Sequence, residues 1–109
     1  MNILADRHCE AKTSLLTGND INSHLQEISP EWQLADDSRS ISRTFRFKNY
    51  YETMAFVNVI AMVAHQQDHH PEMIVTYNTC RVVFSTHSVD GLSMNDFICA
   101  AKVDGTLNI

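Results

Sequence analysis

Residues 49–71 of the chain have the sequence NYYETMAFVNVIAMVAHQQDHHP, which has the strongest helical pattern in the chain. Its apolar side chains recur at helical intervals and form one stripe, made of Phe56, Val59, Ile60 and Val63. Asn49 is placed to cap the start of a helix, and Pro71 disfavours helical backbone at the residue before it. We therefore predict a long central helix over about residues 50–67, followed by a loop.

On the N-terminal side of this helix, two extended segments are separated by a turn. Residues 32–35 begin an extended run, and the short polar side chains of residues 36–38 favour a turn. Beyond the turn, alternate positions carry large side chains, as in a strand with one buried face: Ile41, Arg43, Phe45 and Phe47. Arg43 interrupts the apolar pattern, which favours a position near an edge. These segments predict a β-hairpin.

The C-terminal side of the helix repeats this arrangement. Residues 73–77 and 81–85 are rich in β-forming side chains and are joined at residues 78–80, which predicts a second hairpin. Two hairpins separated by a long helix can form one antiparallel sheet, with helices covering its apolar face. The pattern therefore favours an α+β fold.

Two shorter helices complete the prediction. Apolar residues at helical spacing indicate a first helix at about residues 20–28, closed by Pro30: Ile21, Leu25 and Ile28. Ser93 and Asp96 stand at capping-box spacing before a last helix, expected over residues 94–103. The predicted order is α-β-β-α-β-β-α, and residues 1–18 show no periodic pattern.

The composition limits the classes of protein to which the chain can belong. The chain has 109 residues, 44% of them hydrophobic, which suits one domain, residues 1–109, with a single core. A net charge of −5 without a Lys/Arg cluster disfavours direct nucleic-acid binding. The apolar run at residues 54–64 is about half as long as a membrane-spanning helix, and the N-terminus does not resemble a secretory segment. We expect a cytoplasmic protein without membrane association.

The three cysteines are widely separated, at Cys9, Cys80 and Cys99, and form no CxxC pair. This spacing suggests neither a disulfide framework nor a thiolate zinc site, and it fits a reducing cytoplasm. We expect Cys80 and Cys99 to behave as small buried apolar residues.

Histidines gather at the end of the predicted central helix. His65, His69 and His70 lie close together in the sequence, and His87 follows a predicted strand. Imidazole titrates near neutral pH, so two or three of them around one ligand would both donate and accept protons. The alternative is that these side chains are solvated or complement the negative end of the helix. Spacing alone leaves both interpretations open.

A metal site is a competing interpretation of the same cluster. His65 and His69 lie four residues apart, with His87 or Asp68 as a third ligand. However, the HExxH arrangement is absent, and Pro71 indicates that His69 lies past the regular helix. We therefore predict no metal.

One signature connects the histidine cluster with the end of the chain: His65-Gln66-Gln67-Asp68-His69-His70-Pro71, then Tyr77, His87 and Asp96. Its order and spacing resemble those of the pterin-4a-carbinolamine dehydratases. The similarity extends over about residues 15–103 and includes Trp32, residues 45–48, 85–87 and 91–93. The resemblance implies an α+β domain with a four-stranded antiparallel sheet and helices packed on one face.

The resemblance also implies an activity. Members of the family remove water from a 4a-hydroxytetrahydropterin without a cofactor, in the recycling of the tetrahydropterin that aromatic amino acid hydroxylases use. The reaction needs one proton delivered to the 4a-hydroxyl and one removed from the ring nitrogen, which suits a pair of imidazoles. His69 and His87 would then do the acid/base work, and His70 would mainly hold the pterin. Which histidine donates and which accepts stays open.

Other site residues follow from the same resemblance. Trp32 matches an aromatic residue beside the pterin pocket, although a lone tryptophan is as often a core residue. Asp68 is expected to bind substrate or an imidazole, or to be solvated, and Tyr77 to pack with its hydroxyl at the rim. Asp96 is expected mainly to cap the last helix, with a supporting role in orienting a histidine. Where His65 stands, the family commonly has a carboxylate.

Two expectations concern partners. A sheet covered on one side leaves apolar strand residues and edges exposed, so we expect a homo-oligomer, either a dimer or a tetramer. Some relatives act as dimerisation cofactors for a transcription factor. The alternative function is therefore a protein-interaction module, in which binding would not require His87.

Overall fold

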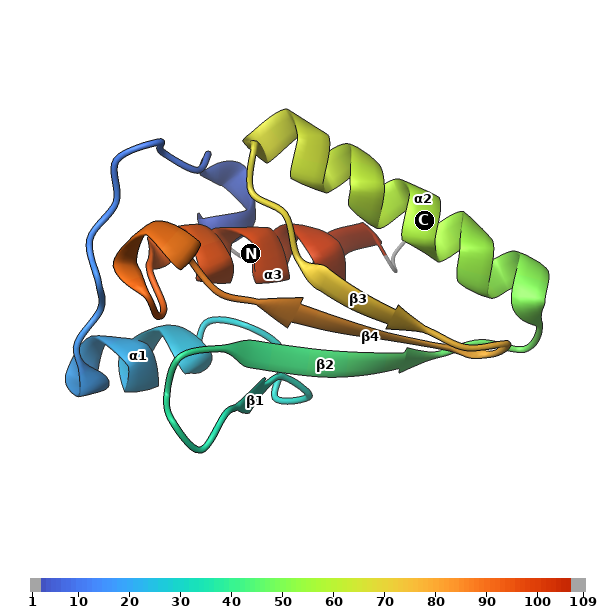
Figure 1. The fold of residues 1–109 in the computed structure, drawn as a ribbon, viewed down its shortest axis with the longest axis horizontal. Coiled ribbons are helices and arrows are strands. Elements are labelled where there is room, and N and C mark those ends of the chain that lie inside the picture. Colours follow the sequence, from blue (N-terminus) through green and yellow to red (C-terminus); the bar gives the residue numbers. More distant parts are fainter. Residues whose placement is uncertain (1–2, 107–109) are drawn as a thin grey trace.

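The computed structural model describes residues 3–106 and has the predicted α+β architecture (Figure 1). In this part of the chain, the predicted order of three helices and four strands is confirmed, and two short 3-10 helices are added. The elements are η1 Ile3–Asp6, α1 Gly18–Leu25, β1 Gln33–Leu34, β2 Ile41–Arg46, α2 Tyr50–Gln67, β3 Glu72–Val75, β4 Thr79–Phe84, η2 His87–Val89 and α3 Met94–Gly105.

Both predicted hairpins belong to one antiparallel sheet. β1 pairs with β2, β3 pairs with β4, and β2 and β4 pair in the middle, which gives the strand order β1-β2-β4-β3. The turn after β1 holds Ser38 in the left-handed region, with a φ of 60°. The turn before β4 covers residues 76–78 instead of the predicted 78–80, because β3 ends at Val75 and β4 already begins at Thr79.

Arg43 interrupts the apolar pattern of β2 for a structural reason. It lies just past the short pairing with β1, so its predicted position near an edge agrees with the structure. Its guanidinium donates to Oδ1 of Asp104 in α3 at 2.7 Å and lies 4.4 Å from the centroid of the Phe45 ring. The α3 carboxylate thus neutralises a partly buried cation on the helix-covered face.

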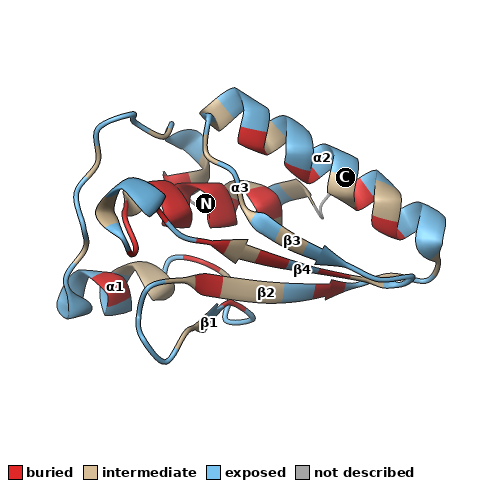
Figure 2. Cartoon of the chain, in the orientation of Figure 1, coloured by how far each residue is buried: buried red, intermediate tan, exposed pale blue. Residues whose placement is uncertain are grey.

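The helices α2 and α3 lie over the same face of the sheet, and α3 forms the centre of the core (Figures 1 and 2). Alternation along β4 sends Cys80, Val82 and Phe84 to this face, where they are buried. α3 is buried along most of its length because it packs against the sheet, α2 and η1. The start of α3 is therefore a rigid platform for the side chains that it carries.

The opposite face of the sheet is mainly polar. Its side chains include Ser42, Thr44, Arg46 and Arg81, together with Ile74 and Val83. The expectation of exposed apolar strand residues therefore holds for only part of this face. The clearest exposed apolar side chains of the sheet are Ile74 and Val75, on β3 at its edge.

Helix α2 has the predicted bounds. Asn49 caps it, because its Oδ1 accepts a hydrogen bond from the backbone N–H of Glu52 at 2.9 Å. The predicted stripe is partly wrong: Val59 is 36% exposed, since the buried face of α2 consists of Thr53, Phe56, Ile60 and Ala64. No helix within residues 3–106 is both long enough and apolar enough to cross a membrane.

The two outer helices differ from their predicted ends. α1 covers residues 18–25 instead of 20–28, and the buried Ile28 joins the core from the turn that follows. α3 continues to Gly105 instead of ending at residue 103. Its predicted capping box is confirmed: the Ser93 side chain accepts from the backbone of the first helical turn, and Asp96 accepts from the Ser93 N–H.

Candidate active site

The centre of the candidate site is a hydrogen bond between an imidazole and a buried carboxylate. His69 follows α2, which ends at Asp68 in the left-handed conformation, with a φ of 49°. Its Nε2 lies 2.6 Å from Oδ1 of Asp96, and its ring stacks on Phe84 with an interplanar angle of 9°. The His69 side chain is 11% exposed, and that of Asp96 is fully buried. Packing and hydrogen bonding therefore fix the orientation of this imidazole.

Asp96 acts both as a helix cap and as the support of His69. Its Oδ2 accepts hydrogen bonds from the Ser93 backbone N–H at 2.9 Å and from the Thr86 hydroxyl at 2.7 Å. The Thr86 and Ser93 hydroxyls are in turn 2.7 Å apart. One carboxylate oxygen thus serves the start of α3 and the other serves the histidine. The predicted cap is confirmed, and the hydrogen bond to His69 is the contact by which Asp96 would orient the imidazole.

Two opposing effects act on the pKa of His69. Burial disfavours the charged imidazolium, but the hydrogen bond to Asp96 and the charge of that carboxylate favour it. Cys9 and Asp68 act in the same direction as Asp96. The pKa of His69 is consequently raised above its ordinary value of 6.5. The imidazole therefore holds a proton over more of the neutral pH range than a solvated histidine does.

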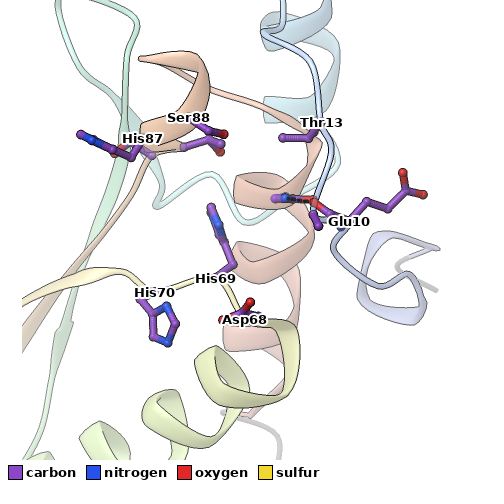
Figure 3. A pocket seen from close by; sticks show the side chains of 11 residues that line it. Glu10, Thr13, Asp68, His69, His70, His87 and Ser88 are labelled. Atoms are coloured by element: carbon purple, nitrogen blue, oxygen red, sulfur yellow. Dashed lines mark hydrogen bonds between the residues drawn. The ribbon is translucent and has the colours of Figure 1, made fainter.

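A cavity of about 420 Å³ lies beside this pair. Its walls come from the N-terminal segment, the segment after α2, the turn after β4 and the start of α3 (Figure 3). The N-terminal segment contributes Thr13 and Glu10, although the Glu10 side chain points away from His69 (Figure 3). Most polar side chains of the cavity are thus carried by loops at one end of the sheet.

The structure brings the other predicted histidines and Asp68 to this cavity. His87, the first residue of η2, lies across the cavity from Thr13 (Figure 3). His70 also lines the cavity, but its ring points in a different direction from that of His69 (Figure 3). Asp68 influences His69 through its charge.

Three other residues that the resemblance singled out lie elsewhere. Trp32 is 5% exposed and buried in the core, where its indole N–H donates to Asp104 at 2.9 Å. Tyr77 is 64% exposed and stacks beside Tyr50, with 6.4 Å between ring centroids. His65 is exposed on α2 and does not line the cavity. Trp32 does not line the cavity, so its contact with substrate stays a prediction.

Two parts of the site were not predicted from the sequence. Asn95 clamps the backbone of Glu10, because its side chain donates to the Glu10 carbonyl at 2.8 Å and accepts from the Glu10 N–H at 3.0 Å. The N-terminal segment that it holds has no periodic pattern and carried no signal. Thr86 was also missed, although it stands next to His87 within a stretch that the family resemblance includes.

The metal interpretation finds no geometric support in the described residues. Within residues 3–106, no group of three or more His, Cys, Asp or Glu side chains is arranged to hold a metal ion. His65 and His69, four residues apart in the sequence, do not converge on one site, because His69 turns toward Asp96 after the helix ends. The chemistry that this arrangement offers is proton transfer by imidazole.

Comparisons with known proteins agree with this geometry. Residues 14–106 match the family described as pterin 4 alpha carbinolamine dehydratase. Two proteins named for this activity are similar: one from Nitrosomonas eutropha is 57% identical over 93% of this chain and 90% of its own length, and one from Legionella pneumophila is 48% identical over 95% of both. A Brucella melitensis crystal structure, described as a transcriptional coactivator/pterin dehydratase, matches with a TM-score of 0.79 at 33% identity, covering 84% of this chain and 96% of that one. The chain belongs to the pterin-4a-carbinolamine dehydratase family.

Proposed function

We propose that this protein removes water from a 4a-hydroxytetrahydropterin and releases the quinonoid dihydropterin by histidine acid/base catalysis. The observation that carries the proposal is the oriented His69–Asp96 pair, 2.6 Å apart, beside a cavity of about 420 Å³. In the reaction the 4a C–O bond breaks and the hydroxyl leaves as water after it takes up a proton. The neighbouring ring nitrogen loses its proton as the C=N bond forms. One proton enters and one leaves.

His69 is the better-defined proton carrier of the site. Because Nε2 donates to the Asp96 carboxylate, Nδ1 is the ring atom that remains to accept or release a proton. The carboxylate stabilises the imidazolium that forms when Nδ1 takes up a proton. The raised pKa of His69 favours the imidazolium, which is the form that delivers a proton.

The remaining cavity residues suit complementary roles. His87 also lines the cavity, at the start of η2, and would make the second proton transfer. His70 and Asp68 are exposed at the cavity and would hold the polar pterin ring. A volume of about 420 Å³ lies within the roughly 300–1,000 Å³ usual for small-molecule sites.

The test is dehydration of a synthetic 4a-hydroxytetrahydropterin, followed by absorbance in stopped flow. Wild-type protein should accelerate the reaction over buffer, both before and after exhaustive chelation. The His69→Gln variant, which keeps a donor toward Asp96 but cannot titrate, is the matched control and should lose most of the acceleration. An unaccelerated reaction would refute the proposal. A rate that disappears with chelator and returns with zinc would replace it with metal catalysis.

We also place the activity in cytoplasmic tetrahydropterin recycling. The support is the chemistry of the proposed product, which a reductase returns to the tetrahydropterin that aromatic amino acid hydroxylases consume. With such a hydroxylase and a dihydropterin reductase supplied, adding the protein should prevent the hydroxylated intermediate from accumulating. Unchanged accumulation with an active dehydratase would argue against this place in metabolism.

A homo-oligomer remains our proposal for the assembled protein. The exposed edge strand β3 and its apolar side chains Ile74 and Val75 support it, since pairing this edge with a second copy would satisfy its backbone groups. Light scattering during size-exclusion chromatography should give a multiple of 12.4 kDa at micromolar concentration. A mass of one chain would contradict it.

A protein-interaction module is the second candidate function. Exposed aromatic side chains gather near the start of α2, where Tyr50 lies beside both Tyr51 and Tyr77. Such side chains are typical of binding surfaces. The Brucella melitensis relative is described as a transcriptional coactivator as well as a dehydratase. Partner binding that survives His87→Ala and is lost with Tyr51→Ala would favour this function.

A further inference from the structure

Two cysteines from opposite ends of the chain meet beside the candidate site. The Sγ atoms of Cys9 and Cys99 are 3.4 Å apart although 90 positions separate them in the sequence. Both are free thiols, so Cys99 is not simply the apolar core residue that the sequence suggests. We propose that Cys9 and Cys99 are an oxidative modification site, at which an intramolecular disulfide forms and fastens the N-terminal segment to α3.

The geometry allows this bond with a small movement of one partner. A disulfide has an S–S distance of about 2.05 Å, so the two sulfurs must approach by roughly 1.3 Å. Cys99 is fully buried inside α3 and is held by the core. Cys9 lies in the irregular segment between η1 and α1, where the Gln67 side chain accepts from its N–H at 2.8 Å. The Cys9 side is therefore the one that moves.

The surroundings assign different roles to the two thiols. The hydrogen bond with Cys99 lowers the pKa of Cys9 despite its partial burial; His69 and Lys102 lower it further, and Asp96 opposes them. The same hydrogen bond and burial raise the pKa of Cys99. Cys9 is also the more accessible of the two. Cys9 is therefore the attacking thiolate, and Cys99 is the resolving thiol.

The oxidant that completes the reaction is a peroxide. The Cys9 thiolate attacks one peroxide oxygen, the O–O bond breaks, and Cys9 becomes a sulfenic acid. The other oxygen leaves as hydroxide and becomes water by taking up the proton that the Cys9 thiol lost on ionising. The Cys99 sulfur then attacks the Cys9 sulfur, the S–O bond breaks, and the hydroxyl leaves with the Cys99 proton as a second water. Two thiols and one hydrogen peroxide thus become one disulfide and two waters.

Oxidation should also change the pKa of His69. The effect of that change on catalysis rests on the proposed function. The charged groups that raise the pKa of His69 are Asp96 on α3, Cys9 on the N-terminal segment and Asp68 at the end of α2. A disulfide carries no charge, so it removes the Cys9 contribution. The limb of the pH–rate profile that His69 governs should then shift to lower pH.

The test uses the wild-type chain, fully reduced, freed of reductant and treated while folded with hydrogen peroxide. After unfolding, one of the three thiols should remain, and peptide mapping should find Cys9 joined to Cys99 within one chain and Cys80 free. Dithiothreitol should reverse the bond, and the oxidised protein should melt several degrees higher, since a long loop is closed. Persistence of three thiols would overturn the proposal, as would a bond between chains or one that includes Cys80.

Matched variants assign the two roles. Cys80→Ala changes a buried cysteine outside the pair and should still form the bond. Cys9→Ser should form none, whereas Cys99→Ala should leave a Cys9 sulfenic acid that dimedone traps. If Cys99→Ala does not fold, the comparison of Cys9→Ser with Cys80→Ala still tests whether the disulfide requires Cys9 and not Cys80. None of these thiol measurements requires dehydratase activity, so their failure and that of the proposed function are separate.

Discussion

The two sides of the cavity hold the same type of side chain in very different ways. On one side, His69 is 11% exposed, donates to a buried carboxylate and stacks on Phe84. On the other side, His87 is exposed at the start of a three-residue 3-10 helix. One histidine is therefore held by the packed core, whereas the other lies on an exposed turn. Substitutions should therefore separate catalysis from stability on one side and affect both on the other.

The origin of this difference is the element behind each histidine. The start of α3 lies behind His69, and its capping box holds Asp96 in the buried core. Behind His87 is a short turn that ends at Asp90 in the left-handed conformation, with a φ of 52°. A helix that buries most of its length fixes its first turn, whereas a turn of three residues does not.

The largest expected effect is on turnover. His69→Ala and His87→Ala should each lower kcat by about 10²–10⁴-fold, the usual contribution of a general acid or base. The two variants should differ in stability, which thermal unfolding of the same samples measures. His87→Ala should change the free energy of unfolding by less than about 0.5 kcal/mol, as exposed substitutions do, while His69→Ala should cost more. Equal losses of stability would remove the distinction between the two sides.

The next effect is on stability, at Asp96. Asp96→Ala removes the partner of His69, the Thr86 hydroxyl and the Ser93 N–H, so it should lower the free energy of unfolding by about 3 kcal/mol. That is more than the roughly 1 kcal/mol expected for a helix cap alone. Urea unfolding measures it. Asp68→Asn removes a carboxylate charge at an exposed position of the cavity and keeps a side chain that tolerates the left-handed backbone there, so it is the control and should have little effect. A loss of only about 1 kcal/mol at Asp96 would show that its hydrogen bonds to His69 and Thr86 contribute little to stability.

A smaller effect is expected at His70, which also lines the cavity. His70→Ala should raise KM with kcat nearly unchanged, because an interaction made equally in the ground and transition states contributes only to binding. Steady-state kinetics with the synthetic hydroxypterin measures both constants. A fall in kcat without a change in KM would instead assign His70 to proton transfer, and the comparison would then involve three histidines.

The smallest effect is a pH dependence of stability on the His69 side. The pKa of His69 is raised in the folded state above 6.5, so the charged pair with Asp96 contributes fully below that pH and its contribution is lost as pH rises through the folded-state pKa. The melting temperature of wild type relative to His69→Gln should therefore be greatest near pH 6 and should shrink toward pH 9. A difference that grows with pH would contradict the raised pKa.

The elements predicted best were those with local signals at both ends. Asn49 and the residues before Pro71 bound α2 correctly, and Ser93 with Asp96 located the start of α3. The side of α2 that faces the core was predicted less well. Val59 satisfies the helical spacing but is exposed, because α2 turns the side of Phe56 and Ile60 toward the core, where Phe56 packs on Phe45 and Phe47.

Local patterns of neighbouring residues were enough to predict which histidines gather near one loop and which carboxylate caps the last helix. The long-range contacts between side chains depend on the packing of the elements. This packing joined His69 to Asp96 across 27 positions, Cys9 to Cys99 across 90, and Trp32 to Asp104 across 72. Such pairs form when helices and sheet bury their apolar faces together, and that packing sets distances that the local pattern of polar residues does not contain.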